Sequence, residues 1–149
     1  MADESFQKEF LETHNAYRAK HGAPPLTLSS DLNDSSQKWA DHLVELGAQK
    51  HSGSAENIYK KIGSTAVTGK EVVDFWYSEI KDYNWSSPGS DWKTGHFTQV
   101  VWKDTTKLGV GVASDGTNVY VVAQYSPPGN MKGNYEKNVL EKDAGSGTA

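Results

Sequence analysis

Glu79 stands at a position where helical periodicity predicts an apolar side chain. An apolar and aromatic stripe at helical spacing runs through Val72, Trp76, Glu79 and Tyr83. Side chains at this spacing share one face of a helix, so the carboxylate of Glu79 should lie among aromatic rings. Burying an isolated carboxylate is so costly that the group must find a proton, a cation or hydrogen-bond donors. Histidine is the obvious partner.

Two histidines and a second glutamate are available to join Glu79. His96 lies in an otherwise apolar and aromatic segment, and His51 and Glu56 precede the Glu79 helix across a short loop. Neutral imidazole and carboxylate groups are ordinary ligands of zinc and other divalent metals. The same groups suit general acid–base catalysis near neutral pH, with Glu56 and Glu79 as the candidate catalytic carboxylates. A polar network that only ties the loop to the helix is a third interpretation, and the spacing leaves all three open.

Ser52 directly follows His51 and is a candidate nucleophile that a histidine and a glutamate would activate. The sequence contains no Gly-x-Ser-x-Gly motif, no phosphate-binding Gly-x-x-x-x-Gly-Lys motif and no His-Glu-x-x-His motif. We therefore rank a hydrolase below a binding protein.

Composition limits the partners that this chain can have. The 149 residues carry a formal net charge of -4 with a pI near 5.7, so no overall positive field attracts nucleic acid. No apolar run approaches the ~20 residues that span a bilayer. The absence of cysteine excludes disulfide bonds and zinc–thiolate sites, so packing alone must stabilise the fold.

Helical patterns dominate the first part of the chain. Rings recur at helical spacing over residues 5–21, where His14 and His21 share the apolar side and are interpreted as packed or capping residues. A second helix is predicted between the N-cap serines at 29–30 and Gly47. Thr68 and Glu71 have the capping-box spacing, so a third helix should begin there and run to about Tyr83.

Strand patterns follow later in the chain. Residues 48–67 are interpreted as a loop with short helical or extended pieces. Thr94 is interpreted as the cap of a short helix through residue 102, with a strand as the alternative because the segment contains β-branched residues. Residues 108–113 and 119–124 are strand-like, and an Asp-Gly turn between them predicts an antiparallel hairpin. Helices first and a hairpin late indicate the α+β class, with an antiparallel sheet covered by helices.

Several segments resemble the CAP superfamily (cysteine-rich secretory, antigen five, pathogenesis-related). Residues 95–102, Gly-His-Phe-Thr-Gln-Val-Val-Trp, resemble its first signature, and residues 121–130 resemble its second. Shorter matches lie at residues 14–18, 51–52, 56–57 and 76–79. The resemblance covers about residues 6–140. It implies one domain over residues 1–149, folded as a three-layer α-β-α sandwich with a central antiparallel sheet.

The resemblance also implies a cleft lined by the four residues that the burial argument selects. They are His51, Glu56, Glu79 and His96. In some members of the superfamily the two histidines hold zinc or another divalent ion. We therefore expect His51 and His96 to be able to hold a divalent metal, with both glutamates in the cleft.

A lipid-binding loop is implied only in part. Sterol-binding members carry the pattern aromatic-x-aromatic-x-x-x-x-aromatic, and Tyr83 and Trp85 supply its first two rings. Ser90 takes the third place, and Trp92 comes two residues late. One lost aromatic contact removes roughly 1.5 to 3 kcal/mol of burial. The expected ligand is therefore a small apolar lipid, a fatty acid in a separate groove between helices rather than a sterol.

Two features bear on the compartment. Val110 and Ala123 stand where most secreted relatives carry cysteine, and residues 108–116 look closest to the intracellular, Golgi-associated branch. Residues 127–130 resemble secreted fungal and plant members, and the second residue is not the glycine that myristoylation requires. We expect a secreted protein, with an intracellular, membrane-associated protein as the alternative.

The resemblance implies a pathogenesis-related binding module for a small apolar lipid, with the four-residue cleft as an ancillary metal site. One alternative is a metal- or serine-dependent hydrolase. The other is a defence-signalling or scaffold protein that meets a membrane surface or a protein partner through exposed Tyr83, Trp85 and Trp92.

Overall fold

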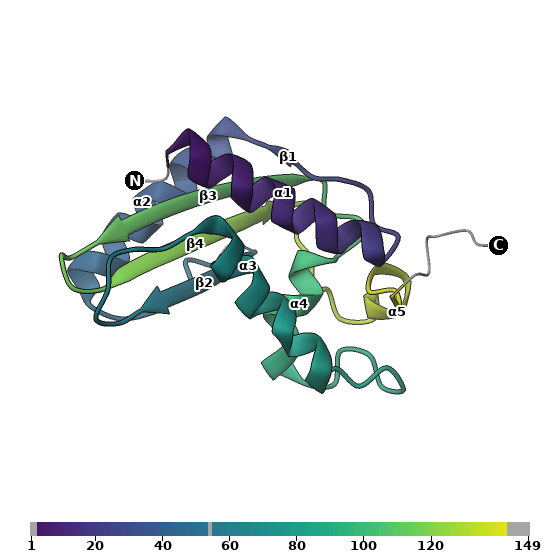
Figure 1. The fold of residues 1–149 in the computed structure, drawn as a ribbon. Helices are drawn as coiled ribbons and strands as arrows, with labels where there is room; N and C mark the ends of the chain where they lie inside the picture. Colours follow the sequence, from purple (N-terminus) through teal and green to yellow (C-terminus); the bar gives the residue numbers. More distant parts are fainter. Residues whose placement is uncertain (1–2, 54, 143–149) are drawn as a thin grey trace.

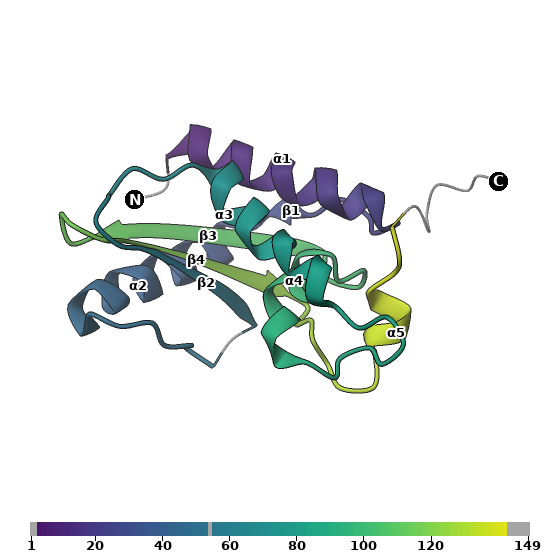
Figure 2. The same ribbon diagram turned by 60° about the horizontal axis from the view of Figure 1, so that its bottom comes forward.

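The structure, a computed structural model, describes residues 3–53 and 55–142 and stacks them in three layers (Figures 1 and 2). The middle layer is a sheet of order β1-β3-β4-β2, formed by β1 (Thr27–Leu28), β2 (Glu56–Lys61), β3 (Lys107–Ser114) and β4 (Val119–Ser126). One face carries α2 (Ser30–Leu46), and the other carries α1 (Glu4–Lys20), α3 (Gly69–Tyr77) and α4 (Gly95–Val100). The predicted α-β-α sandwich is confirmed.

The sheet is antiparallel except at one edge. β3 and β4 form the predicted hairpin, with Val110 opposite Ala123, and β2 pairs antiparallel with the other side of β4. The two-residue β1 runs parallel to the start of β3. The prediction of an antiparallel sheet therefore holds for its three long strands.

Side-chain caps begin α1 and α2, and the two ends of α2 lie where the sequence predicts. The Asp3 carboxylate accepts the Phe6 N–H at 2.8 Å and begins α1. The Ser29 hydroxyl accepts the Leu32 N–H at the start of α2, and Gly47 ends α2 in the left-handed conformation at φ 69°.

No helix of the described residues is long and apolar enough to cross a membrane.

The third helix is shorter than predicted. The capping box of Thr68 and Glu71 is present, but α3 ends at Tyr77 and continues as the 3₁₀ helix η1 (Ser78–Asp82). The Ser78 hydroxyl donates to the Phe75 carbonyl at 2.6 Å, a local bond that competes with the α-helical ladder. Glu79 therefore enters the site from a tighter helix than the 3.6-residue periodicity assumed.

The short helix α4 is present with Thr94 at its N-cap position as predicted, but it ends at Val100 and the Thr94 side chain does not cap it. The Thr94 hydroxyl donates to the Asp91 carbonyl at 2.9 Å and makes no capping bond to the helix. The Glu79 carboxylate caps α4 instead, because one of its oxygens accepts the backbone N–H groups of His96 and Phe97, each at 3.0 Å. A residue distant in sequence thus satisfies the free donors of this helix.

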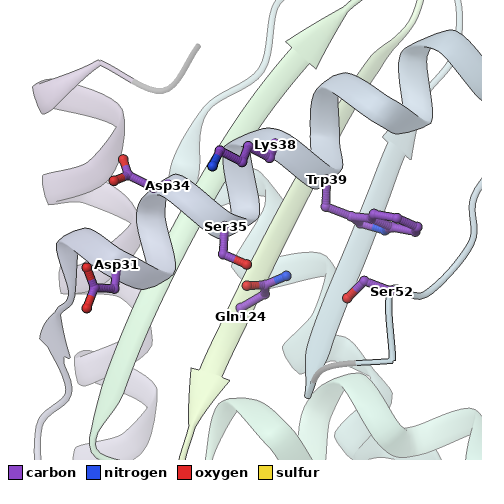
Figure 3. Close-up of a pocket in the computed structure, with 7 residues that line it drawn as sticks. All are labelled: Asp31, Asp34, Ser35, Lys38, Trp39, Ser52 and Gln124. Atoms are coloured by element: carbon purple, nitrogen blue, oxygen red, sulfur yellow. The ribbon is translucent and has the colours of Figure 1, made fainter.

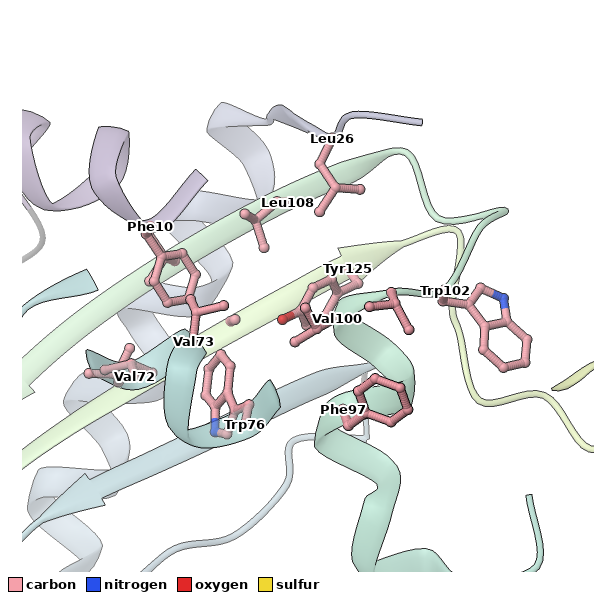
Figure 4. Close-up of a cluster of buried hydrophobic side chains, with 14 of the residues drawn as sticks. Phe10, Leu26, Val72, Val73, Trp76, Phe97, Val100, Trp102, Leu108 and Tyr125 are labelled. Atoms are coloured by element: carbon pink, nitrogen blue, oxygen red, sulfur yellow. The ribbon is translucent and has the colours of Figure 1, made fainter. Parts of the chain in front are cut away.

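Two hydrophobic cores hold the layers together. The larger lies between the sheet and the α1–α3–α4 layer, and Figure 4 shows Phe10, Trp76, Phe97 and Tyr125 gathered there. The smaller lies under α2 and consists of Ala40, Leu43, Ile58, Ala113, Tyr120 and Val122. Each face of the sheet therefore has its own packed interior.

Buried Arg18 fixes the far end of α4. Its guanidinium is inaccessible to solvent and donates to four carbonyl oxygens, those of Pro24, Val100, Trp102 and Thr105. Burial lowers the pKa of Arg18 to about 10, which keeps the group cationic at neutral pH. A cation among carbonyl groups at a helix C-terminus is favourable.

Two glycines allow α2 to lie against the outer edge of β3. A Cβ at Gly111 would overlap backbone atoms of Gln37 and Ser36, and Gly109 is equally close to Leu32. At this distance the Gln37 side chain reaches the strand, accepting from Val112 N at 3.1 Å and donating to Val112 O at 2.8 Å. The α2 side chains thus replace a missing neighbouring strand.

We expect Gly111→Ala to lower the free energy of unfolding by about 1 to 3 kcal/mol, because overpacking pushes α2 away from the edge of β3. Urea denaturation measures the loss. Gly95→Ala is the matched control, since its Cβ would meet only the Asn130 amide at 3.7 Å. Equal stability of the two variants would contradict this account of the α2 packing.

Candidate functional site

His96 and Glu79 form the better ordered of two histidine–glutamate pairs. The His96 Nδ1–H donates to a Glu79 oxygen at 2.8 Å, while the other Glu79 oxygen caps α4. The His96 side chain is 35% exposed and that of Glu79 is 19% exposed. The Trp76 ring lies nearly parallel to the imidazole, with 6.0 Å between ring centroids and 8° between planes. The imidazole is therefore oriented on two sides and still reaches solvent.

The pairing decides which ring nitrogen of His96 is free to act. A carboxylate can only accept, so the neutral imidazole must carry its proton on Nδ1. Nε2 then holds the lone pair. An imidazole whose second nitrogen donates to a carboxylate is the usual arrangement of metal-binding histidines.

His51 and Glu56 form the second pair. His51 Nδ1 lies 3.4 Å from a Glu56 oxygen, and the two side chains are 62% and 0% exposed, respectively. The buried carboxylate also accepts the Ser52 N–H, the Ser52 hydroxyl at 2.8 Å and the Gln124 amide at 3.1 Å. Glu56 is thus supported by donors, whereas the His51 ring stands at the surface.

The first two residues of β2 point to opposite faces of the sheet. Glu56 is opposite Gln124 in the β2–β4 register and shares with it the face that α2 covers. Asn57, one residue later, points to the other face because strand side chains alternate. Its amide nitrogen lies 3.1 Å from the His96 carbonyl and 3.2 Å from the Tyr125 hydroxyl. Asn57 is therefore the link between the first residue of β2 and the His96 pair.

In the structure the four predicted site residues form two pairs, His51 with Glu56 and His96 with Glu79. Over residues 3–53 and 55–142 it contains no group of three or more His, Cys, Asp or Glu side chains placed to hold a metal ion. The donor set nonetheless fits a two-histidine site, because both imidazoles turn Nδ1 toward a carboxylate. Convergence of all four residues on one metal stays a prediction.

A buried network behind His96 was missed by the sequence reasoning. The His14 Nδ1–H donates to the Phe10 carbonyl at 2.9 Å, so its Nε2 must accept from the Tyr125 hydroxyl at 2.8 Å. The Tyr125 oxygen in turn accepts from Asn57. Residues 48–67 were interpreted as a loop, so the strand alternation in β2 that turns Asn57 away from Glu56 could not be used to find this network. The interpretation of His14 as a packed residue is confirmed by its complete burial.

The interpretation of Tyr83 as part of an exposed aromatic patch is wrong. Tyr83 is only 7% exposed, and its ring packs against Phe97 at 5.4 Å and Trp85 at 4.7 Å between centroids. Trp85 is half-buried and packs on the same core, because the apolar rings of this loop gain more by joining Phe97 than by facing water. Ser90 is exposed. The Trp92 side chain lies outside the described part.

A cleft of about 530 Å³ adjoins this loop, between it and α5 (Tyr135–Asn138). We name it the Trp85 cleft, and its lining comprises Trp85, Ser86, Pro88, Glu136, Val139, Leu140 and Glu141. Apolar walls with acidic groups at the rim suit an amphipathic small molecule.

Comparison with known proteins gives one consistent result. Residues 11–125 match the model of the family described as CAP, the cysteine-rich secretory protein family. The chain is 47% identical over 149 residues to the human Golgi-associated plant pathogenesis-related protein 1, covering 93% of this chain and 95% of that protein. It is 38% identical over 135 residues to the Secreted protein RBT4 of Candida albicans, covering 88% of this chain but 37% of that protein.

A solved structure agrees on the fold. The crystal structure of NaASP2 with Zn2+ superposes with a TM-score of 0.77 at 22% identity, covering 97% of this chain and 90% of that one.

Burial makes His14 a source of pH-dependent stability. Desolvation, opposed by the Phe10 carbonyl and assisted by the Arg18 charge, lowers the pKa of His14 to about 3. The unfolded chain binds a proton near pH 6.5, so it takes up more protons than the folded chain between these values. The stability is complete above the unfolded pKa and is lost as the pH falls toward the folded one.

We expect the wild type to lose about 2 kcal/mol more unfolding free energy than His14→Gln between pH 7 and pH 5, which is the linkage contribution of one histidine over that interval. Urea denaturation at several pH values measures the difference. His42→Gln, at an exposed position, should follow the wild type. Parallel pH profiles for the wild type and His14→Gln would disprove the role of His14.

Proposed function

Since this chain belongs to the CAP, cysteine-rich secretory protein family, we propose that it is a binding protein whose His51 and His96 take up a divalent metal ion. The carrying observation is that each imidazole turns Nδ1 toward a carboxylate. This leaves Nε2 of each ring as a neutral nitrogen donor, the form that zinc binds.

The two histidines would be the protein ligands of this metal. Glu56 and Glu79 stand behind them and hold the rings in the metal-binding tautomer. A bound zinc ion would supply a positive charge and an electrophilic centre beside the exposed imidazoles. The related fold of NaASP2 was crystallised with zinc, which supports the proposal by analogy of fold alone.

Hydrolysis through Ser52 is less well supported. Its hydroxyl donates to Glu56, and His51 faces the same carboxylate rather than the serine. In serine hydrolases the imidazole stands between the nucleophile and the acid. Here Glu56 stands between Ser52 and His51. This arrangement orients the two side chains rather than passing a proton from the serine to the imidazole.

A small apolar lipid is the second proposed ligand, and the Trp85 cleft is the observation that favours it. Its volume of about 530 Å³ lies within the usual range of small-molecule sites. Trp85, Val139 and Leu140 would contact the chain of a fatty acid, so the ligand would lie beside the aromatic loop and not in the separate groove between helices that the resemblance implies. The serine at position 90 argues against a sterol, as it removes one ring from the aromatic loop pattern.

The compartment is proposed from the relatives. One relative is named a secreted protein and another is named as Golgi-associated. We propose secretion, with a membrane-associated intracellular location as the alternative.

The metal proposal predicts that His51→Ala and His96→Ala each weaken zinc binding at least tenfold, because each removes one nitrogen ligand. Glu79→Gln should weaken it about 10- to 100-fold, as loss of a carboxylate behind a ligand does. Isothermal titration with zinc chloride measures the affinities, and circular dichroism checks the fold. His42→Ala is the exposed control histidine, and unchanged zinc affinity in the double variant of His51 and His96 would refute the site.

The lipid proposal predicts that Leu140→Asp weakens binding of the fluorescent fatty acid cis-parinaric acid about tenfold or more. Burial of one leucine-sized contact contributes roughly 1.5 to 3 kcal/mol, and an aspartate side chain cannot replace that apolar contact. Ile62→Asp is the matched control, because Ile62 is 76% exposed and lies outside the Trp85 cleft. Equal binding by the two variants would place the lipid elsewhere.

A further inference from the structure

A polar groove lies on the α2 face of the sheet, next to the His51–Glu56 pair. We name it the α2 groove. Its volume is about 540 Å³, and its lining comprises Asp31, Asp34, Ser35, Lys38, Trp39, Ser52 and Gln124 (Figure 3). A second hollow of about 490 Å³ shares Ser35 and Gln124 with it and extends to Pro128 and Gly129. The two hollows therefore form one elongated depression along α2.

The centre of the α2 groove is built from uncharged polar groups. Figure 3 shows Ser35 reaching from α2 toward Gln124 on β4, with Ser52 beside them. Gln124 is only 2% exposed, and its bond to Glu56 uses one of the two N–H groups of its amide. A buried amide held in one orientation is a preformed hydrogen-bonding group at the floor of the groove.

The ends of the α2 groove differ from its centre. Trp39 lies at one end, where its indole N–H donates to the Lys50 carbonyl at 2.7 Å, which fixes the ring edge. The carboxylates of Asp31 and Asp34 lie toward the other end, with the Lys38 ammonium group between the two ends. One elongated site thus combines an aromatic ring, hydroxyls, an amide and charges of both signs.

This combination matches a ligand with many hydroxyl groups. Each hydroxyl both donates and accepts, so it pairs equally well with a carboxylate, an amide, a serine or an ammonium group. The C–H face of a sugar ring is apolar and packs on an indole. A fatty acid would leave the polar floor unpaired, and an anionic polymer would meet two carboxylates against one ammonium group.

We propose that the α2 groove binds a neutral oligosaccharide, with Trp39 as the stacking ring and Ser35, Ser52 and Gln124 as the central hydrogen-bonding groups. The groove is open to solvent, so we expect a low affinity for one short oligosaccharide. Because Ser52 and Gln124 also hold Glu56, the sugar lies directly behind the His51 pair. The site is nevertheless separate from the proposed metal ligands.

Titration of the ¹⁵N-labelled full chain with cellotetraose and with chitotetraose, in the presence of EDTA, tests the proposal. The expected result is a set of NMR shifts confined to the Trp39 indole N–H, the Gln124 side-chain amide and the Ser35 backbone amide. EDTA removes any dependence on metal, so failure of the zinc site leaves this result unaffected.

Two variants and one control decide whether the shifts report the α2 groove. Ser35→Arg fills the centre from an exposed helix position, and Trp39→Ala removes the ring, so each should weaken oligosaccharide binding at least tenfold. Leu46→Arg adds the same charge on α2 outside the groove and should bind as the wild type does. The proposal is overturned by the absence of shifts with both oligosaccharides, by unchanged binding in Ser35→Arg, or by shifts that a lysine-rich peptide produces and the sugars do not.

Discussion

The carboxylate of Glu79 is the group on which the site depends most. It joins η1 to α4 by accepting two backbone N–H groups, and it accepts the Nδ1–H of His96 with its other oxygen. One side chain therefore caps a helix, orients an imidazole and selects its tautomer. A six-residue helix has little stability of its own. It is held at its start by Glu79 and at its end by the Arg18 guanidinium, which bonds the Val100 and Trp102 carbonyls.

The sequence predicted the elements well where local signals act alone. The Ser29 and Thr68 caps and the left-handed Gly47 are decided within a few residues, so the helix boundaries that they set were predictable. The end of α3 and the side-chain cap of α4 could not be predicted in this way, because each depends on a hydrogen bond that the helical periodicity does not include. The Ser78 hydroxyl takes a carbonyl from the helical ladder, and Glu79 caps a helix that begins sixteen residues later in the chain.

The sequence predicted the four site residues as one group. It did not predict that His51 pairs with Glu56 and His96 with Glu79. Burial of a carboxylate on an aromatic stripe predicts a histidine partner for Glu79, and His96 is that partner. Periodicity says nothing about which face of a strand Glu56 uses, because that depends on the register with β4. The register places Glu56 with Gln124 under α2 and sends Asn57 to the His96 side. Asn57, rather than Glu56, is therefore the β2 residue that bonds the His96 segment.

The hydrogen bonds of the two carboxylates bear on what the site can do. A general base needs a lone pair directed at the substrate proton. Glu79 spends its oxygens on two backbone N–H groups and an imidazole, and Glu56 accepts from Ser52 and Gln124 while it faces His51. Carboxylates engaged in this way hold other groups in place rather than exchange protons with a ligand. The metal that we propose would therefore be held by the Nε2 atoms of the two histidines, on the side of each ring opposite its carboxylate partner.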